Sequence, residues 1–155
     1  MAQNGEIHEN GQNIDFLPAT GLVITTALTA VTTTPVEVLT GMKYVAFQVR
    51  FVYGSSGTNA KFWLQTTFDS GRTWCDIACL ARTTASLNTV VNTTLTSGTA
   101  LATPTTLTDA TLADNTIVQG LLGSQLRMKY TTTGTYAGST TATSLEPGAC
   151  SSPDT

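Results

Sequence analysis

Two carboxylates lie close together in the sequence, Asp69 and Asp76, and they are the residues best placed for chemistry. Glycosidases use two carboxyl groups that flank the bond to be cleaved. A serine or cysteine nucleophile normally needs a histidine base, and the only histidine, His8, lies in a polar N-terminal stretch. No glycine-rich phosphate loop follows a predicted strand. Because Asp69 also has a structural use in a turn, the sequence predicts no enzyme and no catalytic residue.

The three cysteines indicate neither a disulfide nor a metal site. On an extended strand, Cys75 and Cys79 would share one face about 13 Å apart, which is beyond the Cα separation that a disulfide allows. Cys150 makes the count odd. Since His8 is the only histidine, a zinc site would lack further ligands. We therefore expect free thiols, no metal and no cofactor, as in a protein assembled in a reducing cytoplasm.

The segment TFDSGRTW at residues 67–74 predicts a tight turn between two strands. The carboxylate of Asp69 can accept hydrogen bonds from backbone N–H groups just ahead of it, and Gly71 supplies the positive φ that a tight reversal needs. The Trp74 ring can fold over the turn while its N–H reaches a nearby carbonyl. The residues assigned to this structural turn are Thr67, Asp69, Gly71, Thr73 and Trp74.

This pattern, Ser/Thr-x-Asp-x-Gly-x-Thr-Trp, resembles the Asp-box, a short hairpin known from sialidases and other secreted hydrolases. The resemblance implies a scaffold turn away from the catalytic centre, and in those enzymes the motif recurs several times. Here it occurs once. A six-bladed propeller, at about 40 to 50 residues per blade, does not fit in 155 residues. We therefore do not expect a sialidase, and we expect a structural role for the motif.

Strand patterns surround the turn. In the segment from Lys43 to Tyr53, alternate residues predict one core-facing side; these are Val45, Phe47, Val49 and Phe51. Further candidate core residues are Phe62, Leu64, Trp74, Ile77, Leu80, Val91, Leu126 and Met128. Other strands are expected within residues 21–31, 35–40, 60–68, 72–81, 85–95 and 124–133. Residues 97–119 are expected to form an ordered surface loop.

These short strands and glycine-rich turns, without a long helical stripe, predict an all-β protein. We expect a single β-sandwich, of which the jelly roll is one form, with extended N- and C-terminal arms. The expected parts are an N-terminal arm at 1–20, a β-sandwich domain at 21–142 and a C-terminal tail at 143–155. The arms lack the apolar content to pack on their own core, so we expect them to lie on a neighbouring subunit or shell.

The surface is expected to be poor in charge. Charged residues make up 11% of the chain and hydrophobic residues 41%, whereas soluble domains average about 25% charged residues. A partner or further copies of the chain are therefore expected to cover much of the surface. The middle of the chain is mildly basic and the flanks are acidic, which suits either docking between copies or solvated ends. No basic cluster predicts a nucleic-acid partner, and no apolar run predicts a membrane span.

The chain from about Lys61 to Ala142 carries a wider resemblance, with FWLQTTFDSGRTWCDIACL at 62–80 and ATPTTLTDATLADNTIVQGLLGSQLRMKYTTTGTYAG at 102–138. They resemble small structural proteins encoded beside capsid genes in tailed bacteriophages and prophages. The resemblance implies a capsid decoration or cement protein that ties capsomers together on the outer shell. It also implies the major capsid protein and further copies, as a dimer or trimer, as partners. The expected location is the capsid surface of the virion, after assembly in the host bacterial cytoplasm.

A second hypothesis is a β-sandwich module of a neck, tail or fibre that binds a host glycan. Its stacking candidates would be Trp63, Trp74, Tyr53 and Tyr136, although Trp63 and Trp74 are better explained as hairpin core. A decoration protein should have a broad, mostly apolar contact area. A glycan binder should instead have an exposed aromatic platform beside polar groups.

Overall fold

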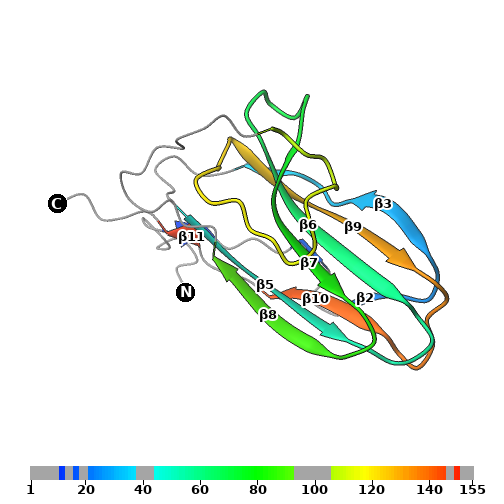
Figure 1. The fold of residues 1–155 in the computed structure, drawn as a ribbon. Helices are drawn as coiled ribbons and strands as arrows, with labels where there is room; N and C mark the ends of the chain where they lie inside the picture. Colours follow the sequence, from blue (N-terminus) through cyan, green and yellow to red (C-terminus); the bar gives the residue numbers. More distant parts are fainter. Residues whose placement is uncertain are drawn as a thin grey trace, which may run out of the picture.

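The computed structural model describes residues 11–12, 16–17, 21–37, 44–92, 106–145 and 149–150. Within this part there is no helix, and the strands form two antiparallel sheets (Figure 1). The all-β prediction is confirmed. The strands are β1 (Gly11–Gln12), β2 (Leu22–Val23), β3 (Leu28–Thr32), β4 (Val36–Glu37), β5 (Tyr44–Val52), β6 (Asn59–Thr67), β7 (Cys75–Arg82), β8 (Leu87–Asn92), β9 (Gln125–Thr133), β10 (Thr141–Leu145) and β11 (Ala149–Cys150).

The two sheets are here called sheet one and sheet two. Sheet one has the order β8–β5–β10–β2, and β11 with β1 continues it beside the start of β5. Sheet two has the order β3–β9–β6–β7, and β4 also pairs with β9. Figure 1 shows the two sheets stacked, with the yellow-green segment before β9 crossing in front of β6 and β7.

The core lies between the sheets and follows the predicted alternation. Phe47, Val49 and Phe51 of β5 are buried, and the ring centroid of Phe51 lies 6.5 Å from that of Phe62 in β6. Other predicted core residues that are buried are Leu64, Ile77, Leu80, Leu126 and Met128. The side chains of Val45 and Val91 lie outside the described residues. Side chains at alternate positions of both sheets therefore fill the space between them.

The predicted strand at 21–31 is two strands in different sheets. β2 pairs with β10 in sheet one, and β3 pairs with β9 in sheet two. The chain bends between them near Thr26, and Ile24 just before the bend is buried in the core. One apolar segment thus contributes to both layers, so a single long strand was the wrong interpretation.

Part of the predicted N-terminal arm belongs to the core, which corrects the expectation that the arm lies elsewhere. Phe16 and Leu17 are buried, and the Phe16 ring meets Phe47 edge-on with centroids 6.1 Å apart. At the other end, β10 extends past residue 142, where the C-terminal tail was expected to begin. Most of the other arm and tail residues lie outside the described residues.

A β-bulge in β7 separates the faces of two cysteines. Leu64 pairs with Ala78 but Gln65 pairs with Asp76, so Ile77 is the extra residue. Cys79 pairs with Trp63 and Cys75 with Thr66. Because neighbouring residues of β6 point to opposite faces, the two thiols also lie on opposite faces of the sheet. The expectation that they share one face, which assumed an unbroken strand, was wrong. Both are buried and unpaired.

Candidate functional site

The predicted turn at residues 67–74 joins β6 to β7 and is closed by side-chain hydrogen bonds. Asp69 accepts from the backbone N–H of Thr73 at 2.8 Å and from its hydroxyl at 2.6 Å. The Thr67 hydroxyl donates to Asp69 at 2.8 Å and accepts from the N–H of Gly71 at 3.0 Å. Gly71 has a φ of 88°. The hydrogen bonds from Thr73 lower the pKa of Asp69 from 3.8 to about 2.

The ring of Trp74 links this turn to the outer face of sheet two. Its Nε1 donates to the carbonyl of Gly71 at 3.1 Å, and the guanidinium of Arg127 lies 4.2 Å from the ring centroid. Arg127 Nε in turn donates to the side-chain carbonyl of Gln65 at 2.8 Å. Trp74 is therefore half-buried under Arg127 and is not in the core between the sheets, which corrects its place among the core candidates.

Asp76, the second candidate carboxylate, is buried and holds a loop. One oxygen accepts from the Gln65 amide at 2.7 Å and from the N–H of Ala110 at 2.9 Å. The other accepts from the N–H groups of Thr111 and Leu112, both at 3.1 Å. Charge-assisted hydrogen bonds of this kind compensate the burial of a carboxylate. Both oxygens of Asp69 and of Asp76 are thus occupied by the chain itself.

The bulge at Ile77 gives Asp76 its direction. In an unbroken register Asp76 would pair with Thr66, which faces the core, and its carboxylate would be buried between the sheets without partners. The extra residue moves Asp76 opposite Gln65, on the outer face. β-Bulges commonly re-aim a side chain in this way.

Residues 106–124, called the covering segment, lie over the outer face of sheet two. The segment also pairs with the edge of β7, through the bonds Asp76 N–Thr108 O, Cys79 N–Thr116 O and Val118 N–Ile77 O at 2.8 to 2.9 Å. Its far end is tied to β6, where a Cβ added at Gly123 would lie 1.9 Å from the carbonyl oxygen of Thr67. The sequence predicted an ordered surface loop in this region but not what it covers.

Asp109 of the covering segment binds the basic residues of β9. It accepts from Lys129 Nζ at 2.8 Å and from the Gln65 amide at 2.7 Å, and Arg127 lies 3.7 Å away. Partial burial raises the pKa of Asp109, but the hydrogen bonds from Lys129 and Gln65 and the two positive charges outweigh it, so the pKa lies below its usual value. On the outer face of sheet two, polar and charged side chains are therefore hydrogen-bonded to one another and to the covering segment.

The four stacking candidates do not form one platform. Trp63 and Tyr136 are buried, and Trp63 Nε1 points at the carbonyl of Leu112 under the covering segment, at 3.4 Å. Trp74 is shielded by Arg127, and Tyr53 is half-buried beside Phe51. The exposed aromatic surface expected of the glycan-binding hypothesis is absent at these four residues.

Several side chains on the outer face of sheet one are exposed among the described residues, and the sequence patterns did not indicate this surface. Val23 is 61% exposed and Val90 is 64% exposed. Arg50 is the only charged residue placed on this face by the strand registers of the described residues, and it forms no ion pair there. The sequence of β5 contains a signal for this surface. Its solvent-facing alternate positions include Gln48, Arg50 and Val52, so only one of these three residues is charged, although charged residues are common at such positions. We call this surface the bare face; its residues are Val23, Gln48, Arg50, Val52, Asn88, Val90 and Thr141.

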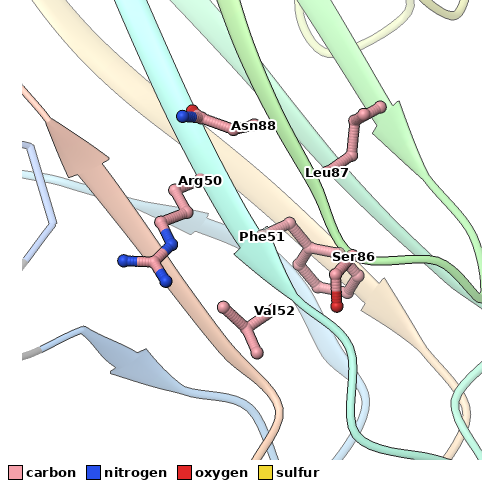
Figure 2. Close-up of a pocket in the computed structure, with 6 residues that line it drawn as sticks. All are labelled: Arg50, Phe51, Val52, Ser86, Leu87 and Asn88. Carbon is pink, nitrogen blue, oxygen red and sulfur yellow. The ribbon is translucent and has the colours of Figure 1, made fainter.

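A shallow groove of about 290 Å³ opens where the end of β5 meets the start of β8 (Figure 2). Figure 2 shows Arg50 and Val52 on one side of β5, while the Phe51 ring lies on the other side, toward the chain that enters β8. Leu87 at this edge is 51% exposed. The residues that line the groove are Arg50, Phe51, Val52, Ser86, Leu87 and Asn88. Its lining is mainly apolar with one cation, which suits contact with a protein surface more than chemistry.

No group of three or more His, Cys, Asp or Glu residues among those that the structure describes could hold a metal ion. In the same part of the chain, no helix has the length and hydropathy to cross a bilayer. Comparison with family models, with curated proteins and with solved structures gives no match. The resemblance to phage virion proteins therefore remains a hypothesis.

Proposed function

We propose that the chain is a structural virion protein of a tailed phage, which decorates and cements the outer capsid surface by non-covalent contacts between capsomers. Its partners are the major capsid protein and further copies of the chain. It acts without catalysis, and it is assembled in the bacterial cytoplasm. The observation that carries the proposal is the bare face, a whole sheet surface with exposed valines and a single charge among the described residues.

A surface of this composition favours protein contact. The centre of a protein interface is depleted in charged residues, while arginine is enriched there. The bare face has Arg50 among Val23, Val52 and Val90, with small polar residues between them. A contiguous exposed apolar patch usually marks a binding surface, and on this face Val23 and Val52 both lie beside Thr141. The neighbouring groove at Leu87 extends the apolar area past the edge of the sheet.

The strand orders support the jelly-roll form of the sandwich. Eight strands make up the two four-stranded layers: β2, β3, β5, β6, β7, β8, β9 and β10. If these are numbered one to eight along the chain, sheet one has the order 1–8–3–6 and sheet two has the order 2–7–4–5. Jelly rolls pair strands by this two-Greek-key pattern and are frequent in viral capsid proteins and in lectins. Because a fold hosts many functions, this likeness supports the proposal less than the bare face does.

The binding of purified shells tests the proposal directly. Val23→Glu adds a charge to the bare face at an exposed residue, so the fold should keep its melting temperature while shell binding is lost. Ile117→Glu is the matched control, because Ile117 is an exposed β-branched residue of the covering segment. Equal binding of both variants and the wild type would overturn the bare face as the contact surface.

Copy number separates decoration from the glycan-binding alternative. A decoration protein should occur in virions in numbers comparable to those of the major capsid protein, measured on a stained gel. The few copies expected of a neck, tail or fibre component would favour the alternative instead.

A further inference from the structure

Exposed strand edges are places where another chain can add a strand, and most edges of this sandwich are blocked. The edge of β7 is occupied by the covering segment. β3 has a register shift between Leu28 and Val31, and Ala30 there has a φ of 51°. The remaining short edge strands, β1, β2 and β4, have two residues each. Short strands, irregularities and covering loops are the usual protection against edge pairing.

Within the described residues, β8 has none of these protections. It has six residues, LNTVVN, and pairs only with β5 in the part of the chain that the structure describes. It contains no charge, proline or glycine, and its register with β5 is unbroken from Leu87 to Asn92. Val90, near its middle, is 64% exposed. In an antiparallel pair alternate residues direct their N–H and C=O groups away from the partner, so β8 presents unpaired backbone groups at this edge.

We propose that a second copy of this chain pairs with that edge, β8 against β8, antiparallel and about a two-fold axis at Val90. The segment from Asn88 to Asn92 reads NTVVN, which is nearly the same in reverse. In this register Asn88 of one copy lies opposite Asn92 of the other, and Thr89 lies opposite Val91. Asparagine therefore meets asparagine and Val90 meets Val90, while Thr89 and Val91 are both β-branched; no charged residue is brought to the axis, so the edge is complementary to itself.

This pairing specifies how copies of the chain would contact one another. It rests on the proposed function in one respect, namely that further copies of the chain are among the partners. A two-fold axis perpendicular to sheet one joins the two copies of the sheet into one continuous sheet. Both bare faces then lie on the same side, which doubles the surface available to a shell. Because only five residues of each strand, Asn88 to Asn92, are paired, the interface is small and the dimer should depend on protein concentration.

Sedimentation of the isolated full-length protein tests the pairing. The wild type should shift from monomer to dimer as concentration rises. Val90→Lys places two like charges at the axis and should stay monomeric at every concentration. Val23→Lys is the control, because Val23 is similarly exposed on the bare face but lies in the opposite edge strand of the same sheet; it should dimerise as the wild type does. Circular dichroism checks that all three are folded.

A thiol pair locates the axis. In a Cys150→Ser background, Val90→Cys should form a covalent dimer on oxidation, while Val23→Cys should not; Cys75 and Cys79 are buried. A wild type that stays monomeric up to its solubility limit, or a Val90→Lys variant that still dimerises, would overturn the proposal. If the wild type is monomeric and Val90→Lys loses only shell binding, the edge takes a strand of a shell protein and self-pairing is wrong, while the proposed function stands.

Discussion

The two outer faces of the sandwich differ in how their side chains are bonded and in how far they are exposed. On sheet two, Gln65 and Asp76 are buried and every oxygen of the Asp76 carboxylate is bonded to the covering segment or to Gln65. On sheet one, Val23 and Val90 are exposed and Arg50 has no ion pair among the described residues. The polar side chains of sheet two are thus hydrogen-bonded within the chain, whereas Val23 and Val90 of sheet one are exposed to solvent.

This difference assigns a separate task to each face. Buried polar groups that are fully satisfied fix one arrangement of the chain, so the covered face stabilises the domain. When another protein covers an exposed, weakly charged sheet, apolar surface is removed from water and the free energy of the system falls. Asp76, one of the two candidate carboxylates for catalysis, therefore belongs to the stabilising face, and we propose the bare face as the one that contacts partners.

The largest effect is expected from Asp76→Ala. The substitution removes the acceptor of four hydrogen bonds and leaves the buried Gln65 amide and the partly buried N–H groups of residues 110–112 without this partner. An unsatisfied buried group costs about 1 to 3 kcal/mol and a partly buried one less, so the free energy of unfolding should fall by roughly 3 kcal/mol. Urea denaturation measures the loss, and amide hydrogen exchange should show faster exchange at residues 110–112.

Asp114→Ala is the matched control for that variant. Asp114 also comes from the covering segment and bonds Lys61 at 2.6 Å, but both side chains are partly exposed. An exposed ion pair contributes about 0 to 1 kcal/mol, so this change should be small. Equal losses for Asp76→Ala and Asp114→Ala would show that the buried carboxylate does not hold the segment.

A smaller effect is expected from Arg127→Lys. Lysine keeps the positive charge near Asp109 but lacks the planar group that stacks on Trp74 and bonds Gln65. We expect a loss of about 1 kcal/mol in unfolding free energy and a change in tryptophan fluorescence. Val52→Lys, a substitution on the bare face, should leave that fluorescence unchanged. No difference between Arg127→Lys and the wild type would mean that the stack is not formed.

The turn should respond to acid. The pKa of Asp69 is lowered from 3.8 to about 2 in the folded protein, so the stabilisation it gives is complete above 3.8 and is lost as the pH falls through about 2. Melting curves between these pH values should show a steeper decline for the wild type than for Asp69→Asn. The same slope in both proteins would contradict the hydrogen-bonded role of this carboxylate.

The smallest effect is expected from Arg82→Met, at the end of β7. Arg82 is buried, and among the described residues its Nε and Nη2 have no hydrogen-bond partner, while Nη1 donates to the carbonyl of Ala81 and to the side chain of Asn115. Removing unsatisfied donors while keeping the volume should leave the melting temperature unchanged or raise it slightly. A large drop would reveal a partner of Arg82 and a polar network that extends farther along β7.

Local patterns in the sequence predicted the strands and much of the core, because alternation in β5 depends only on neighbouring residues. The pattern failed at β10, whose sequence TATSL is polar although the strand lies between β5 and β2. It also failed at Phe16 and Leu17, which are isolated apolar residues in a polar stretch.

The two faces could not be predicted in the same way, because they depend on pairing across the chain. The bulge at Ile77 follows from the register with β6 and not from the residues of β7 alone. The bonds from Asp76 to residues 110–112 join positions more than thirty apart in the sequence. The hairpin at 67–74 was predictable because all its bonds are local.

Hydrogen exchange on the shell-bound protein tests the central claim most directly, namely that the bare face makes contact and the covered face does not. Amides of β5 and β8 should become protected when the protein binds purified shells, and those of residues 106–124 should exchange as in the free protein. Protection of residues 106–124 with none in β5 and β8 would contradict the account.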